Sequence, residues 1–131
     1  KLAENFGVSD KIIFLPRMPY QEMMKYTAAC DLGLTFDKDT NINYRFSLPN
    51  KIFDYIRAGI PVMASRLPEV EKIVDGYGIG WFISCHEPEV MAKEIYAAMH
   101  DEEAIDRCRK NLQLAAADLT WENELKKYPK L

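Results

Sequence analysis

Short apolar runs alternate with helical patterns along the whole chain, and this alternation constrains the fold more than any other feature. The apolar runs, each the length of a buried strand, cover residues 12–15, 31–36, 61–65 and 81–84. The helical patterns cover residues 1–6, 19–30, 49–58, 68–74, 87–99 and 102–119, and a last helix follows Thr120. Strands joined by crossover helices form a parallel sheet. The sequence therefore predicts an α/β, Rossmann-like parallel sheet with helices on both faces.

The stretch SLPNKIFDYIRAGIPVMAS, residues 47–65, combines a helix, a stop signal and a strand. Ile52, Phe53 and Ile56 recur at helical spacing and predict a face that packs into the core. Gly59 can adopt the left-handed conformation that ends a helix, and the proline two residues later prevents the helix from continuing. In parallel sheets, ligands bind beyond the carboxyl ends of the strands. A site is therefore expected at the start of this helix and in the loop before it.

Two features of this stretch suit a nucleotide. The backbone N–H groups around Ser47 and Leu48, with the positive end of the helix dipole, suit a phosphate. Ser47 would otherwise act only as the helix cap. The carboxylate of Asp54 can accept hydrogen bonds from both vicinal hydroxyls of a ribose. The alternative for Asp54 is a surface acid paired with Lys51 or Arg57, and the residues alone leave both possibilities open.

Composition argues against several other classes of protein. The net charge of −3 gives no support for binding nucleic acid through a basic surface. The apolar runs are too short to cross a bilayer, and no secretory leader is expected before the first helix. Cys30, Cys85 and Cys108 are odd in number and widely spaced, which favours reduced, mostly buried thiols over disulfides or a zinc site. Neither His86 nor His100 is assigned a catalytic role.

The stretch 47–65 resembles the donor-binding segment of GT-B glycosyltransferases of the group 1 (family 4) type. In that family an acidic residue on this helix precedes a small-residue turn and a Pro-Val strand. Other segments resemble the same family in the same order, and these are KIIFLP with RMP after it, AACDLGLTF, LPEVEKIVDGYGIGWFI and LTWENELKKY. The ordered set covers nearly the whole chain. It implies the carboxyl-terminal, donor-binding subdomain of a GT-B enzyme, without its first strands.

The resemblance implies a role for individual residues. Asp54 takes the position whose carboxylate binds the donor ribose. Ser47 and Leu48 take the turn whose backbone amides approach the diphosphate. Arg17 and Met18 take the loop that lies beside the nucleotide base.

Three further positions bear on the donor. Phe46 stands where many members carry a second acid that contacts the donor sugar, so the identity of that sugar stays open. Lys51 or Arg45 would lend positive charge to the diphosphate, or else remain solvated. By the same resemblance, the departing diphosphate is stabilised by N–H groups and cations, without a metal or a cofactor.

The resemblance also implies a function and partners for residues 1–131, as a single partial domain. The domain would bind a nucleotide diphosphate sugar, and the enzyme would move the sugar to an acceptor hydroxyl with retention at the anomeric carbon. The acceptor domain and the basic diphosphate-binding residues are expected upstream of Lys1, so the chain alone should bind nucleotide weakly and transfer no sugar. The expected location is the cytoplasm, with the full-length enzyme at the inner face of the membrane for polysaccharide or lipid-linked acceptors.

Two other classes of protein share this fold and stay open from the sequence. A sugar-nucleotide epimerase would need acid–base residues around one sugar, in an upstream half. The other is a non-catalytic interaction domain of flavodoxin-like or receiver type. A receiver would need clustered acids at the strand ends for a metal and a phospho-acceptor, but those ends read FLP, LTF and MAS and carry no acid. The glycosyltransferase is the function that the ordered resemblance favours.

Overall fold

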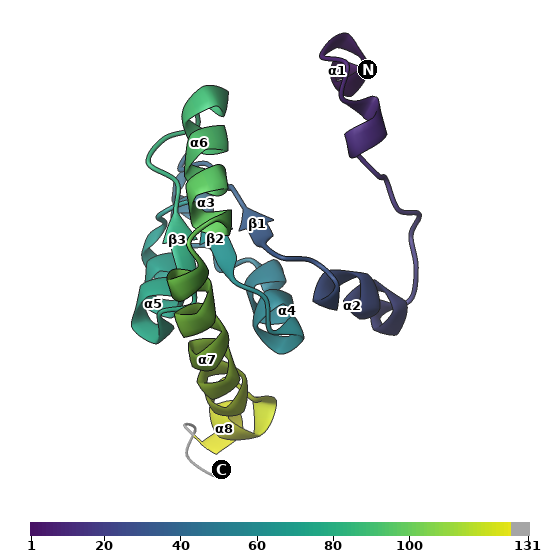
Figure 1. Ribbon diagram of the computed structural model, residues 1–131. Coiled ribbons are helices and arrows are strands. Elements are labelled where there is room, and N and C mark those ends of the chain that lie inside the picture. Colours follow the sequence, from purple (N-terminus) through teal and green to yellow (C-terminus); the bar gives the residue numbers. More distant parts are fainter. Residues whose placement is uncertain (127–131) are drawn as a thin grey trace.

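Three short parallel strands form the centre of the computed structural model, which describes residues 1–126 (Figure 1). They are β1 (Gly33–Thr35), β2 (Val62–Ala64) and β3 (Gly80–Phe82), in the order β1-β2-β3. The register pairs Gly33 with Val62, and Val62 with Gly80. Each strand overlaps an apolar run of the sequence. The prediction of an α/β fold with a parallel sheet is confirmed.

Helices connect the strands, as the sequence predicts. They are α1 (Leu2–Asn5), α2 (Tyr20–Ala28), α3 (Ile42–Arg45), α4 (Asn50–Ala58), α5 (Pro68–Tyr77), α6 (Pro88–Met99), α7 (Glu102–Asp118) and α8 (Trp121–Lys126), with a 3₁₀ turn over Ser9–Lys11. The short α3 lies in a segment expected to be a loop. Helix α5 continues through Asp75 and Gly76, where its end was expected, because the left-handed residue that ends it is Gly78, with φ 68°. Thr120 caps α8, as expected, by accepting from the Asn123 N–H at 3.1 Å.

Helices cover both faces of the sheet. Side chains alternate along β2, so that Val62 and Ala64 belong to one buried cluster and Met63 to another. On the first face, buried side chains from α4, α5 and α7 pack against β2; they are Ile52, Ile56, Val70, Val74, Leu112 and Ala115. On the second face, Met63 packs with Ala98 of α6. Burial on both faces explains why β2 is apolar throughout.

Helix α4 returns the chain to the sheet at a defined point. It ends at Gly59, which adopts the left-handed conformation with φ 77° and ψ 28°. The Ile60 N–H then donates to the Tyr55 carbonyl at 3.1 Å, which satisfies one of the last carbonyls of the helix. Ile60 is buried, and β2 begins two residues later. The stop signal in the sequence therefore acts as predicted.

The prediction of a buried strand at residues 12–15 is wrong. No strand of the described residues pairs with this segment, and its side chains are exposed, Ile13 by 82% and Phe14 by 88%. Figure 1 shows the segment after α1 as an extended trace apart from the sheet. A strand needs a neighbour for its N–H and C=O groups, and an apolar run needs a face to cover it. The local pattern of 12–15 is that of a strand, but pairing depends on residues elsewhere.

The cysteines differ partly from expectation. All three are free, but Cys30 is exposed, Cys85 is half-buried and only Cys108 is buried. Burial raises the pKa of the Cys108 thiol, which lowers its reactivity at neutral pH. The prediction of mostly buried thiols therefore holds for one of the three.

Tyr55 joins α4 to β1. Its hydroxyl donates to the Leu34 carbonyl at 2.9 Å. A Cβ atom at Gly33 would lie 2.5 Å from the Tyr55 ring, so glycine at this position allows the ring to lie against the strand. Because Leu34 is the middle residue of an edge strand, this bond satisfies a carbonyl of the sheet edge.

Tyr55→Phe is expected to make stability less sensitive to alkaline pH. Burial raises the pKa of the Tyr55 hydroxyl above its ordinary value of 10.0, so the unfolded chain loses this proton at a lower pH than the folded chain. The stability that the protonated Tyr55 hydroxyl contributes is therefore fully present below pH 10 and is lost as the pH rises through the pKa of the folded state. Urea unfolding between about pH 7 and about pH 11 should show a steeper loss of unfolding free energy for wild type than for the variant. At neutral pH the variant should be less stable by about 1 kcal/mol, the worth of one hydrogen bond.

The matched control is Tyr26→Phe, because Tyr26 is 53% exposed on α2. Its pH dependence should follow that of wild type. Parallel curves for wild type and Tyr55→Phe would contradict the prediction.

Candidate functional site

The carboxyl ends of the three strands lie at one edge of the sheet, because the strands are parallel. The segment 36–49 follows β1, Ser65 follows β2, and residues 83–87 follow β3. Helix α4 also begins at this edge, because it leads from the end of β1 back to the start of β2. Ligands of parallel α/β sheets bind at this edge.

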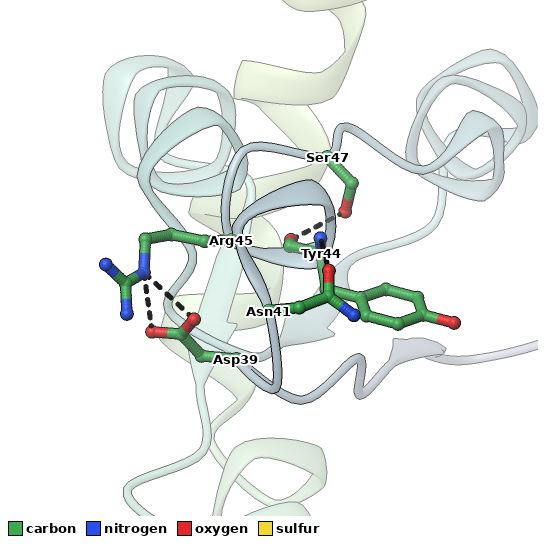
Figure 2. Close-up of polar contacts among 5 residues, drawn as sticks. All are labelled: Asp39, Asn41, Tyr44, Arg45 and Ser47. Atoms are coloured by element: carbon green, nitrogen blue, oxygen red, sulfur yellow. Dashed lines mark hydrogen bonds and ion pairs between the residues drawn. The ribbon is translucent and has the colours of Figure 1, made fainter.

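Polar contacts within residues 36–49 stabilise the segment that follows β1 (Figure 2). Asn41 caps α3 by accepting from the Tyr44 N–H at 3.0 Å. The Nε of Arg45 donates to both carboxylate oxygens of Asp39, at 2.9 and 3.1 Å. The positive charge expected of Arg45 is therefore shared with a neighbouring acid, which the sequence analysis did not identify. About half of each side chain of this pair is exposed, so the pair contributes little stability.

The start of α4 carries no side-chain cap. The alternative in which Ser47 acts as that cap is wrong, because its hydroxyl donates to the Tyr44 carbonyl at 2.9 Å (Figure 2). Pro49 occupies the cap position with extended backbone and has no hydroxyl, amide or carboxylate to offer. No side chain therefore caps the N–H groups at the positive end of the α4 dipole, which follows Ser47 and Leu48 in the chain.

Asp54 lies in the second turn of α4 and is half-buried. Its Oδ1 accepts a hydrogen bond from the Tyr20 hydroxyl at 2.8 Å. Nη1 of Arg57 donates to the same hydroxyl at 2.8 Å, and the guanidinium lies 5.9 Å from the Tyr20 ring centroid. Among the described residues, Asp54 forms no ion pair with Lys51 or Arg57. The direct ion pair considered for Asp54 is therefore not formed. Arg57 is linked to Asp54 only by the hydrogen bonds that both residues make with the Tyr20 hydroxyl.

Tyr20 brings two separate parts of the expected site together. Arg17 and Met18 lie on the loop directly before Tyr20, and the Tyr20 hydroxyl touches Asp54, 34 residues further along the chain. Arg17 is exposed and Met18 is half-buried. The loop expected beside a base and the acid expected to bind a ribose are therefore connected by one side chain.

The remaining expected residues flank the start of α4. Phe46 is 54% exposed, and Lys51 is exposed. The Leu48 side chain packs against the core cluster that contains Ile52. Leu48 also lines a cavity of about 760 Å³ beside α4, with Phe53 and other mostly apolar side chains. Asp54 does not line this cavity, so a polar ligand of Asp54 would lie elsewhere.

Ser65 and His86 meet at the carboxyl ends of all three strands, which the sequence analysis missed. Nε2 of His86 lies 3.3 Å from the buried Ser65 Oγ and 3.3 Å from the Phe36 carbonyl. Because a carbonyl only accepts, the bond to Phe36 requires a hydrogen on Nε2. The available signal was the position of Ser65 at the end of one predicted strand and of His86 two residues after another. The sequence analysis assigned His86 no catalytic role. The described residues contain no group of three or more side chains that could hold a metal ion.

Comparison with known proteins identifies the family. The family model described as glycosyl transferases group 1 matches residues 1–114. Searches among curated proteins and among solved structures gave no match. Within the described residues, no helix is both long enough and apolar enough to cross a membrane. The match covers most of the chain and agrees with its parallel α/β sheet, so the chain belongs to the group 1 glycosyltransferases.

Proposed function

We propose that this chain is the donor-binding part of a GT-B glycosyltransferase of the family 4 type. It binds a nucleotide diphosphate sugar at the carboxyl edge of its sheet. The observation that carries the proposal is Asp54, a half-buried carboxylate in the second turn of α4, the helix that begins at that edge without a side-chain cap. A carboxylate there can accept from the vicinal hydroxyls of a ribose while the first turn of α4 faces the phosphates.

Each part of the donor has a partner in this proposal. Asp54 binds the ribose, and the backbone amide of Leu48 approaches the diphosphate. The Ser47 N–H, expected to do the same, donates instead to the Tyr44 carbonyl at 3.2 Å. The exposed ammonium of Lys51 in the first turn of α4 adds positive charge. Arg17 and Met18 lie beside the base.

Phe46 contacts the sugar in the same proposal. It stands where many family members carry an acid, so the sugar meets an aromatic ring, which is 54% exposed and accessible. Aromatic rings offer a sugar apolar contact in place of charged hydrogen bonds. The identity of the sugar therefore depends on groups besides this side chain.

The reaction is transfer of the sugar to an acceptor hydroxyl with retention at the anomeric carbon. The bond between the anomeric carbon and the diphosphate breaks, a bond to the acceptor oxygen forms, and the proton of the acceptor hydroxyl passes to the departing diphosphate. Donors aimed at the departing diphosphate stabilise the charge that develops on it. We place the acceptor-binding half of the enzyme outside these 131 residues, and the enzyme at the inner face of the membrane.

Asp54→Asn tests the ribose contact. The variant keeps the size of the side chain but loses the charge and one acceptor oxygen, so the affinity for nucleoside diphosphates should fall about tenfold or more. Calorimetric titration with uridine, guanosine and adenosine diphosphates would measure this fall and the preferred base. The control is Asp106→Asn, because Asp106 is an exposed acid on α7, away from the carboxyl edge. Equal affinities for wild type and Asp54→Asn would remove Asp54 from the site.

A further inference from the structure

Tyr20 is the contact that joins α2 to the acid of α4. It is the first residue of α2, and its hydroxyl lies 2.8 Å from Asp54 Oδ1 and 2.8 Å from Arg57 Nη1. The two helices pack against each other, so the contact lies in an interface between elements that are far apart in the sequence. No motif of the sequence identifies Tyr20 as part of the site.

The chemistry of the three groups fixes the direction of both hydrogen bonds. A guanidinium only donates, so the Tyr20 oxygen accepts from Arg57. A carboxylate only accepts, so the single phenolic hydrogen is directed at Asp54. Hydrogen bonds arranged in such a chain polarise one another, and the cation at one end strengthens the donor that faces the acid.

The phenol keeps its hydrogen over a wide pH range. Desolvation raises the pKa of Tyr20 above its ordinary value, and the hydrogen bond and charge of Asp54 raise it further against the opposing effect of Arg57. Tyr20 is therefore a donor to Asp54 throughout the neutral range.

The second carboxylate oxygen of Asp54 stays available. No hydrogen bond from a described residue reaches Oδ2, whereas Oδ1 is held by Tyr20. A carboxylate held at one oxygen has lost part of its rotational freedom before a ligand arrives, which lowers the entropy cost of binding. The free oxygen, and the remaining lone pair of Oδ1, match the two neighbouring hydroxyls of a ribose.

We infer that Tyr20 is a positioning residue, which holds Asp54 so that the carboxylate recognises the 2′,3′-diol of a ribonucleotide. Arg57 directs the Tyr20 hydroxyl and does not itself touch the ligand. This inference rests on the proposed function and adds to it a prediction of which sugar of the nucleotide the site selects. The site distinguishes ribose from a sugar without the diol.

The test uses Tyr20→Phe, which removes the hydroxyl and keeps the ring beside Arg57. The full chain is titrated with a ribonucleoside diphosphate and with its 2′,3′-dideoxy counterpart. Tyr20→Phe should weaken binding of the ribonucleotide about three- to tenfold, the worth of one hydrogen bond, and change binding of the dideoxy compound less than about twofold. The matched control is Tyr26→Phe, on the same helix, whose hydroxyl contacts no other described residue. It should leave both affinities unchanged.

A double-mutant cycle with Asp54→Asn distinguishes positioning from a structural role. If Tyr20 acts through the acid, Tyr20→Phe should change ribonucleotide affinity less than about twofold in the Asp54→Asn background. An equal loss for both nucleotides, or the same loss with and without Asp54, would overturn the inference and leave the proposed function standing. A wild-type chain that binds the ribonucleotide and its dideoxy counterpart equally, or neither, would overturn the ribose role of Asp54 and the inference with it.

Discussion

Gly80→Ala is expected to destabilise the protein by about 3 kcal/mol or more. A Cβ atom at Gly80 would lie 1.8 Å from the Val62 carbonyl oxygen and 2.7 Å from the Val62 carbonyl carbon. These atoms are backbone of the neighbouring strand, so relief requires β2 and β3 to separate and to weaken the bonds that pair them. Because the total stability of a domain is about 5–15 kcal/mol, a large share of it would be lost. Urea unfolding followed by circular dichroism would measure the change in free energy.

Gly76→Ala is the control for this prediction. Gly76 lies inside α5, and a Cβ atom there would meet nothing within 4 Å. Alanine is the better helix former, so this variant should be more stable by about 0.5–1 kcal/mol. A Gly80→Ala variant as stable as wild type would show that the sheet can open at little cost.

Local signals were sufficient to predict most of the fold. The end of α4 depends on Gly59 and the proline that follows, and all the contacts that end this helix lie within a few residues of one another. The apolar pattern of α4 likewise predicted that Ile52 and Ile56 are buried. It was wrong for Phe53, which is half-buried, belongs to neither core cluster and lines the cavity beside α4. Such features depend on neighbours in the chain, so the residues themselves carry the information.

Pairing between distant segments could not be predicted in this way. Residues 12–15 have the composition of a buried strand, yet they lie exposed because no described strand pairs with them. Apolar composition predicts that burial of these side chains is favourable, but it does not predict which surface will cover them. The alternation of elements predicted a sheet correctly and could not predict which runs would join it.

The same difference between local and long-range contacts applies to the candidate site. The sequence correctly predicted where α4 begins and that Asp54 lies on it, because local spacing determines both; the binding role of Asp54 stays a prediction. The Tyr20 hydroxyl reaches Asp54 across 34 residues, and His86 reaches Ser65 across 21, so neither contact leaves a pattern in the sequence. The pairing of Arg45 with Asp39 depends on the turn of α3, which lies in a segment that was expected to be a loop.

Ile52→Ala is expected to cost about 2–5 kcal/mol of unfolding free energy. Ile52 is fully buried at 0% exposure, and it packs in the cluster that joins α4 to β2, α5 and α7. Removal of three carbon atoms loses their burial and leaves a cavity that rigid strands and helices cannot fill completely. Urea unfolding would measure the loss.

Ile42→Ala is the matched control, because it removes the same atoms from a side chain that is 69% exposed on α3. It should change stability by less than about 0.5 kcal/mol. Ile52 precedes Asp54 by two residues on the same helix, so a cavity beneath α4 loosens the element that carries the acid. Nucleotide affinity should therefore fall in Ile52→Ala even where the variant is still folded, and stay at the wild-type value in Ile42→Ala. Wild-type affinity in a folded but destabilised Ile52→Ala would show that α4 holds Asp54 independently of its packing on the core.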